Sequence, residues 1–303
     1  MQRPNDPNLY LWVMGEWYCY NLYDVPIGSG AMGDVYKGIR CRDRSFVAIK
    51  RVKDIFANNP MIRERARQEA SLAFRHENLV EMIGYCEVAP NKGPIFMISK
   101  YVEGEDIDKF VHRFDGSSQW VEKICSMIYP VLDALDYVHS RGVIHRDIKP
   151  SNIMIERNSN VRLMDLGIAR MNGGNKFSMS GFIGTPEYAA PEQIRRDEMG
   201  DGAISATTDI YSLGITFYEL LTGHNPMADP VESRVLQKQL NSKLPSNPKI
   251  PRRLMQVIWK ATEKQQSQRY PTALAFKNAI KEALMPEPSW WERFTSWLGN
   301  LFS

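Results

Sequence analysis

The sequence lacks the patterns that mark membrane-spanning, secreted and nucleic-acid-binding chains. No stretch of its 303 residues approaches the ~20 consecutive apolar residues that a membrane-spanning helix needs. The amino-terminal segment MQRPNDPNLY has no basic start followed by an apolar run, so it does not predict a signal peptide. The 38 Lys and Arg residues exceed the 35 Asp and Glu residues by only three, which gives no argument for a nucleic-acid partner or a polybasic membrane surface. We therefore expect a soluble cytoplasmic protein.

Cysteine is also scarce. The four cysteines, Cys19, Cys41, Cys86 and Cys125, are far apart in the sequence, and no C-x-x-C pair occurs. A disulfide framework or a structural zinc site is therefore not expected, and the pattern is typical of a reducing compartment. Hydrophobic residues make up 43% of the chain and charged residues 24%, which is enough apolar material for a buried core.

The apolar spacing changes along the chain. Short β-branched or aromatic runs at residues 35–39, 46–52 and 95–98 predict strands in the first hundred residues, and residues 61–74 predict one helix between them. From residue 118 onward the spacing is helical, although Pro130 predicts a kink or a break. Further helices are predicted at residues 209–222 (ended by Gly223), 230–240, 252–264 and 272–284. The pattern indicates a small strand-rich lobe, a mainly helical lobe and a hinge near residues 100–104.

A glycine-rich segment at residues 27–35, IGSGAMGDV, contains the pattern G-x-G-x-x-G. A dinucleotide-binding site would need a helix directly afterwards, but residues 35–39 alternate like a strand. A Walker-type loop would need Gly-Lys-Ser/Thr, which is absent. The remaining interpretations are a hairpin whose backbone N–H groups lie over phosphates, or a flexible hairpin without a ligand.

Two charged residues follow this segment at informative positions. Lys50 ends the strand-like segment VAIK, and Glu69 lies 19 residues later on the predicted helix. A pair between them would hold the ammonium group where it can neutralise phosphate charge. Taken alone, Lys50 would be an ordinary surface lysine.

The second half of the chain contains HRDIKPSN at residues 145–152, DLG at residues 165–167 and APE at residues 190–192. Together with the glycine-rich segment and Lys50, these motifs make residues 20–285 resemble the protein kinase family, and in particular the Ser/Thr kinases common in bacteria. The resemblance implies an α+β fold of two lobes, with a β-rich lobe at residues 18–99 and a helical lobe at residues 100–285. Residues 1–17 and 286–303 would be an extension and a tail.

The resemblance also implies roles for the charged residues. Asp147 would orient the acceptor hydroxyl and accept its proton, Lys149 would contact the γ-phosphate, and Lys50, paired with Glu69, would hold the α- and β-phosphates of ATP. Asn152 and Asp165 would bind Mg²⁺ or Mn²⁺ through oxygen atoms. The ATP-binding set implied by the resemblance is Ile27, Gly28, Ser29, Gly30, Ala31, Met32, Gly33, Val35, Ala48, Lys50, Ser99, Lys100, Val102 and Met154.

Within this set the resemblance assigns Val35 and Ala48 to the upper wall of an apolar slot and Met154 to its lower wall. Backbone groups of Lys100 and Val102 would meet adenine, and the small Ser99 would leave the rear of the pocket open.

The resemblance further implies two supporting contacts. Asp209 would hold the catalytic loop through backbone N–H groups, and Arg269 would pair with Glu192. Leu166 stands where many kinases have phenylalanine, which preserves an apolar residue at that position.

Residues 172–180 are rich in Gly, Ser and Asn, and this composition predicts a mobile loop. We expect autophosphorylation at Ser178 or Ser180, with Arg146 able to pair with the phosphate. Thr185 resembles the threonine that contacts the catalytic aspartate and lysine in Ser/Thr kinases. The alternative is that the two serines only keep the loop soluble.

The two ends lie outside the resemblance. Residues 289–303 place Trp, Phe and Leu side chains on one face of a predicted helix, which fits packing on the helical lobe, a partner, or weak membrane contact. Tyr10, Trp12 and Trp17 predict an extra strand on the small lobe. The favoured function is an active Ser/Thr protein kinase, and the alternatives are a nucleotide-binding scaffold and a small-molecule kinase.

Overall fold

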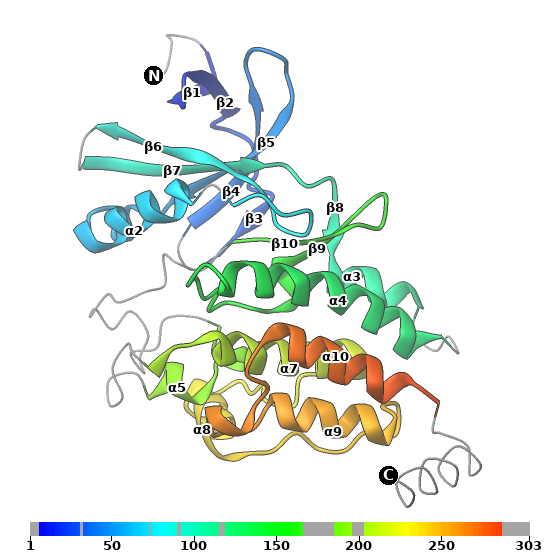
Figure 1. Cartoon of the computed structure of the whole chain (residues 1–303). Coiled ribbons are helices and arrows are strands. Elements are labelled where there is room, and N and C mark those ends of the chain that lie inside the picture. Colours follow the sequence, from blue (N-terminus) through cyan, green and yellow to red (C-terminus); the bar gives the residue numbers. More distant parts are fainter. Residues whose placement is uncertain are drawn as a thin grey trace, which may run out of the picture.

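The computed structural model describes residues 6–30, 33–72, 74–89, 92–114, 119–165, 185–195 and 203–286 of the chain. These residues form a smaller amino-terminal lobe built mainly from a curled sheet and a larger lobe built mainly from helices (Figure 1). The predicted α+β fold with two lobes is therefore confirmed. Within the described ranges, no helix combines the length and the apolar character that crossing a membrane requires.

The sheet of the small lobe has seven antiparallel strands. Six of them follow the order β1-β2-β4-β5-β7-β6, and the short β3 pairs with β4. The runs predicted as strands lie in β4, β5 and β7, where side chains alternate between the two faces of the sheet. The strands are β1 (Asn8–Val13), β2 (Glu16–Asn21), β3 (Gly28–Ser29), β4 (Gly33–Arg40), β5 (Phe46–Val52), β6 (Met82–Ala89) and β7 (Lys92–Lys100).

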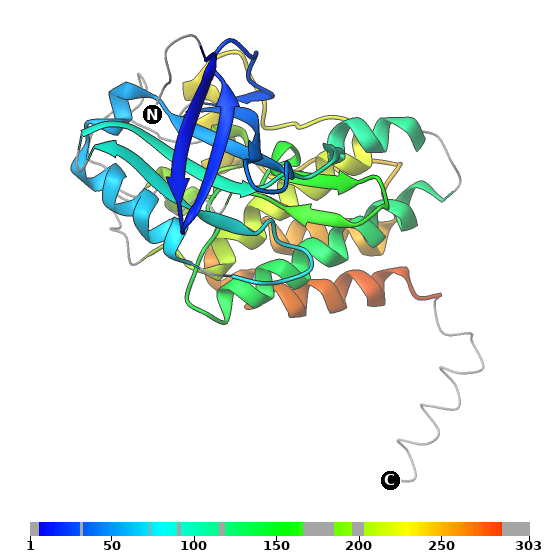
Figure 2. The ribbon, with the colours of Figure 1, turned by 90° about the horizontal axis from the view of Figure 1, so that it is seen from above.

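Both faces of this sheet are buried. Helices α1 (Asp54–Ala57) and α2 (Pro60–Ser71) cover the inner face, where Ile62 and Ala66 pack against Met97. The β1–β2 hairpin covers the outer face and is seen from above as it runs across β6 and β7 (Figure 2). The outer cluster consists of Leu11, Val13, Tyr18, Tyr20, Val47, Ile49, Phe96 and Ile98.

The hairpin also brings the two edges of the sheet close together, because β1 contacts β6. A Cβ atom at Gly84 would lie 2.6 Å from Cγ1 of Val13, so this approach requires glycine at that position. The strand predicted from the aromatic residues near the amino terminus is β1, and the boundary placed between residues 17 and 18 falls inside β2.

The large lobe begins with a three-stranded sheet that lies under the small lobe. This sheet has the order β10-β9-β8, and its strands are β8 (Gly104–Asp106), β9 (Ile153–Glu156) and β10 (Val161–Leu163). The helices are α3 (Ile107–Val111), α4 (Trp120–His139), α5 (Pro191–Ile194), α7 (Ala206–Thr222), α8 (Glu232–Asn241), α9 (Arg252–Ala261) and α10 (Ala273–Leu284).

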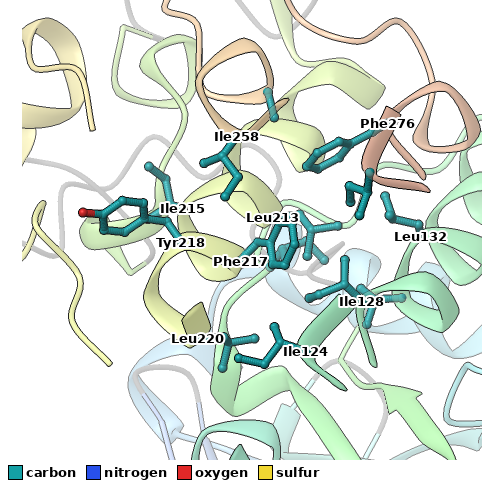
Figure 3. Packing of buried hydrophobic residues seen from close by; sticks show 14 of the residues in the cluster. Ile124, Ile128, Leu132, Leu213, Ile215, Phe217, Tyr218, Leu220, Ile258 and Phe276 are labelled. Carbon is teal, nitrogen blue, oxygen red and sulfur yellow. The ribbon is translucent and has the colours of Figure 1, made fainter. Parts of the chain in front are cut away.

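Helices α4, α7, α9 and α10 share one hydrophobic core, in which Ile128, Phe217, Ile258 and Phe276 are fully buried (Figure 3). Helix α7 is buried around most of its circumference and ends at Gly223, whose φ of +74° is the left-handed conformation that favours glycine. This rigid centre supports the loops that carry the candidate site.

Of the kink or break expected at Pro130, the break does not occur, because helix α4 continues through this residue to His139. Ile128, Val131 and Leu132 on either side of the proline are fully buried. Burial of the apolar face on both sides therefore outweighs the backbone hydrogen bond that proline cannot donate.

Candidate active site

A cavity of about 450 Å³ lies between the two lobes. The small lobe contributes the strand residues Val35, Ala48 and Lys50, and the large lobe contributes Met154 and Asp165. The other residues that line the cavity are Ile27, Gly28, Leu72, Phe74, Leu79, Val80, Met82, Ser99, Lys100, Tyr101, Val102, Gly104, Glu105, Asp106, Lys109, Ser151, Leu163 and Met164.

The sheet explains how distant residues come to face this cavity. Val35 on β4 is opposite Lys50 on β5, and Ala48 on β5 is opposite Ser99 on β7. Because Ala48 and Lys50 are two residues apart on one strand, they point to the same face. Met154 on β9 lies on the opposite side of the cavity, so an apolar slot is formed.

The backbone groups of Lys100, the last residue of β7, differ in whether they are free to meet a ligand in the cavity. The N–H group of Lys100 donates to the carbonyl oxygen of Glu81 at 2.9 Å, so this N–H group is already used within the small lobe. The Lys100 ammonium also lies 2.5 Å from the Glu81 carboxylate, and this hydrogen bond lowers the pKa of Glu81. Lys100 can therefore meet a ligand through its carbonyl oxygen.

Ser99 lies at the cavity beside a group of apolar residues. Leu72, Phe74, Leu79 and Met82 line the cavity together with this small side chain. The expectation that Ser99 leaves the rear of the pocket open stays a prediction.

Hydrogen bonds hold the described residues of the glycine-rich segment in place. The N–H group of Gly30 donates to the carbonyl oxygen of Gly33 at 2.9 Å, and the Lys53 ammonium donates to the carbonyl oxygen of Gly30 at 2.8 Å. A Cβ atom at Gly33 would lie 2.5 Å from the carbonyl oxygen of Arg51, so glycine is needed there. Ala31 and Met32 lie outside the described residues. No local pattern in the sequence pointed to the contact of Lys53.

The cavity also brings together two charged residues that are 115 positions apart. The Lys50 ammonium lies 3.1 Å from Oδ2 of Asp165. Asp165 has a φ of +46°, an unfavourable conformation for a residue with a side chain and one that is often found at functional sites. Glu69 lies in α2 as expected, but its side chain is outside the description, so its pairing with Lys50 stays a prediction.

The catalytic-loop candidates form a connected network next to Asp165. The amide nitrogen of Asn152 donates to the backbone oxygen of Asp147 at 2.7 Å and to Oδ2 of Asp147 at 2.8 Å. The backbone oxygen of Asn152 accepts from the N–H group of Met164, the residue before Asp165. Asp147 and Asn152 are both buried, at 8% and 7% exposure.

Lys149 and Thr185 complete this network. The Lys149 ammonium donates to Oγ1 of Thr185 at 2.8 Å and lies 3.6 Å from Oδ2 of Asp147. Oγ1 of Thr185 lies 3.5 Å from Oδ1 of Asp147. Asn152, Lys149 and Thr185, which come from two distant segments, therefore meet around the carboxylate of Asp147.

Asp209 holds the loop that carries Asp147. Its buried carboxylate accepts hydrogen bonds from the N–H groups of His145 and Arg146, each at 2.7 Å, and lies 2.7 Å from Nε2 of His139. Burial acts to raise the pKa of Asp209, but the hydrogen bonds and His139 outweigh it, so the pKa lies below its usual value. Arg146 has a φ of +67°, a conformation that these contacts stabilise. No motif in the sequence pointed to the contact of His139.

The expected pair between Glu192 and Arg269 is a buried, bidentate ion pair. Its two N–O distances are 2.7 and 2.9 Å, and the hydroxyl of Thr208 donates to the same carboxylate at 2.8 Å. This pair connects α5 to the segment before α10, and it fixes the chain that follows Thr185. Ser178, Ser180 and Leu166 lie outside the described residues.

The oxygen atoms that Asp165 and Asn152 offer are of the kind that suits a hard divalent cation. Asp165 offers carboxylate oxygens, and Asn152 uses its amide nitrogen on Asp147, which leaves its amide oxygen for a ligand. Carboxylate and amide oxygens are ligands that Mg²⁺ accepts together with phosphate and water. The donor set therefore fits a metal–nucleotide complex.

Comparisons with known proteins agree with this geometry. A family model described as protein kinase domain matches residues 23–282. A probable serine/threonine-protein kinase of Streptomyces coelicolor is 31% identical over 86% of this chain and 39% of its own length. PknH of Mycobacterium tuberculosis is 32% identical over 85% of this chain and 41% of its length, and PknB of Mycobacterium leprae is 33% identical over 84% and 41%.

Solved structures give the same result for the fold. A crystal structure of the PknI kinase domain of Mycobacterium tuberculosis has a TM-score of 0.64 and 23% identity, covering 85% of this chain and 93% of that one. The chain spans about 40% of the length of the curated relatives named above.

Proposed function

The chain belongs to the protein kinase family, and on this basis we propose that it transfers the γ-phosphate of ATP to serine and threonine hydroxyls of protein substrates. One observation carries the proposal. Lys50 and Asp165 meet at the cavity between the lobes, and the Asp147 network is joined to the segment of Asp165 by the hydrogen bond from Met164 to Asn152.

ATP is the substrate that fits this cavity. Adenine would occupy the slot between Ala48 and Met154, and the carbonyl oxygen of Lys100 would accept a hydrogen bond from its amino group. Lys50 would move from Asp165 toward the α- and β-phosphates, because a triphosphate offers more negative charge than one carboxylate. The glycine-rich segment would bring backbone N–H groups close to the same phosphates.

Asp165 and Asn152 would hold a divalent cation, for which we propose Mg²⁺. When bound, this cation would neutralise charge on the transferred phosphate group. Its two protein ligands lie on segments connected by the hydrogen bond from Met164 to Asn152, so their relative position is fixed before nucleotide binds.

Asp147 is the residue that we propose orients the acceptor hydroxyl and accepts its proton. The amide of Asn152 holds Oδ2 of Asp147, so the carboxylate keeps one orientation. Lys149 would stabilise negative charge on the transferred group, and Thr185 keeps the lysine beside the carboxylate. This arrangement would lower the activation barrier of phosphate transfer mainly by positioning the acceptor hydroxyl and by stabilising negative charge.

Protein substrates are favoured over small molecules by the segment that follows Thr185. The buried pair of Glu192 with Arg269 fixes this segment next to Asp147, where a peptide would lie.

We also propose that Ser178 or Ser180 is autophosphorylated and that the phosphate pairs with Arg146. A cytoplasmic location and contact of residues 289–303 with a partner or a membrane remain part of the proposal.

The test is phosphate transfer from labelled ATP to a generic basic protein and to the chain itself. Asp147→Asn is expected to lower the rate about 100- to 10,000-fold, while ATP binding measured by calorimetry stays close to that of the natural protein. Asp43→Asn, on the exposed β4–β5 turn, is the matched control and should leave the rate unchanged. An Asp147→Asn protein that keeps most of its transfer rate would refute the role of Asp147.

A further inference from the structure

Two cysteine thiols lie next to each other on the small lobe. The sulfur atoms of Cys19 and Cys41 are 3.7 Å apart, although 22 positions separate the residues in the sequence. Cys19 is opposite Ile39 in the β2–β4 pair, and the N–H group of Cys41 donates to the carbonyl oxygen of Trp17 just beyond this pair. The two cysteines are thus diagonal neighbours on one face of the antiparallel strands.

The two thiols differ in their access to solvent. Cys41 is partly exposed, whereas Cys19 is buried. Burial and the hydrogen bond with Cys41 raise the pKa of Cys19 to about 11, so the Cys19 thiol stays protonated at neutral pH. A dissolved oxidant therefore meets Cys41 first, and Cys19 is already in contact with the product of that reaction.

The other two cysteines have no such arrangement. Cys125 is completely buried in the core of the large lobe, and the sulfur of Cys86 contacts a backbone carbonyl oxygen, that of Glu87. Among the described residues, Cys19 and Cys41 are thus the two thiols in contact with each other. Of the thiols in the described residues, these two are therefore the pair positioned to cross-link within one chain.

We propose that Cys19 and Cys41 form a reversible disulfide when the protein meets hydrogen peroxide. The thiolate of Cys41 attacks one peroxide oxygen, the O–O bond breaks, and Cys41 becomes a sulfenic acid with loss of hydroxide. The sulfur of Cys19 then attacks the sulfur of Cys41, and the S–O bond breaks. The hydroxyl group leaves as water with the proton of Cys19. Two thiols and one peroxide thus give one disulfide and two waters, and a dithiol reductant reverses the reaction.

The cross-link would enclose the glycine-rich segment. Residues 19–41 contain the glycine-rich segment, with β3 and all of β4, including Val35, which lines the cavity. A disulfide across the base of this segment reduces the conformations that it can adopt when unfolded. The consequence for ATP rests on the proposed function: a restrained segment would change ATP affinity and turnover.

The experiment uses the full chain with equimolar hydrogen peroxide, followed by alkylation and mass spectrometry under non-reducing conditions. We expect loss of the mass of two hydrogen atoms and one linked peptide pair containing Cys19 and Cys41, reversed by dithiothreitol. The melting temperature should rise by roughly 5 °C in the oxidised protein. Cys41→Ser should abolish the cross-link and the shift, and Cys86→Ser should keep both.

Three results would overturn the proposal. These are a cross-link that involves Cys86 or Cys125, oxidation of Cys41 to the sulfinic acid with Cys19 still a free thiol, and a Cys41→Ser protein that still forms a disulfide. Peptide mapping does not depend on phosphate transfer. A chain that cross-links but never transfers phosphate in either state would contradict the proposed function alone.

Discussion

Removal of the Arg269 guanidinium tests how the large lobe keeps the segment that follows Thr185 in place. This group makes two hydrogen bonds to Glu192 and three to backbone carbonyl oxygens, at 2.7 to 3.2 Å. In Arg269→Ala, the carboxylate of Glu192, which is 2% exposed, would stay buried with the hydroxyl of Thr208 still donating to it. An uncompensated buried charge costs about 3–5 kcal/mol of unfolding free energy.

The assay is urea unfolding followed by tryptophan fluorescence, with thermal melting as a second measurement. The matched control is Arg157→Ala, which removes an exposed ion pair with Glu103 at 3.0 Å, where the two side chains are 77% and 57% exposed. Exposed pairs contribute less than about 1 kcal/mol. Equal losses in the two variants would show that burial of the pair does not determine its energetic importance.

Two further predictions concern other buried groups. Burial, with Arg269 nearby, lowers the pKa of Lys264 to about 8, from the ordinary lysine pKa of 10.5 that applies in the unfolded chain. Between these values the unfolded chain binds more protons, so unfolding free energy should rise from pH 8 to pH 10 relative to Lys264→Met, as urea titrations would show. A difference in unfolding free energy between the two proteins that stays constant from pH 8 to pH 10 would contradict this prediction. In the hairpin, Leu11→Ala should cost about 2–4 kcal/mol. Trp12→Ala, at 53% exposure, should cost far less in the same assay, and equal losses would refute hairpin packing.

Local patterns predicted the elements well wherever the apolar period was unbroken. The strands around Lys50 and the helix α7 with its terminal Gly223 were predicted because period and capping residues are properties of neighbouring residues. Of the two outcomes predicted at Pro130, a kink or a break, the break was wrong, because the compensating burial comes from helices that are distant in the sequence.

The site itself could be predicted only through the family resemblance. Lys50 and Asp165 are 115 positions apart, and no composition or spacing places them within 3.1 Å of each other. Contacts outside the motifs were missed for the same reason. His139 against Asp209 and Lys53 against Gly30 have no local signal, since each pairing depends on how separate elements pack.

The β1–β2 hairpin has a practical consequence for the limits of the folded unit. The family match starts at residue 23, after both strands of the hairpin. A shortened chain that starts there would leave Val47, Ile49 and Phe96 facing water and would remove the strand that pairs with Ile39 and Arg40 at the end of β4. Apolar surface next to an open strand edge favours self-association. The family match therefore begins inside the folded unit, because the hairpin that precedes residue 23 is packed into the same lobe.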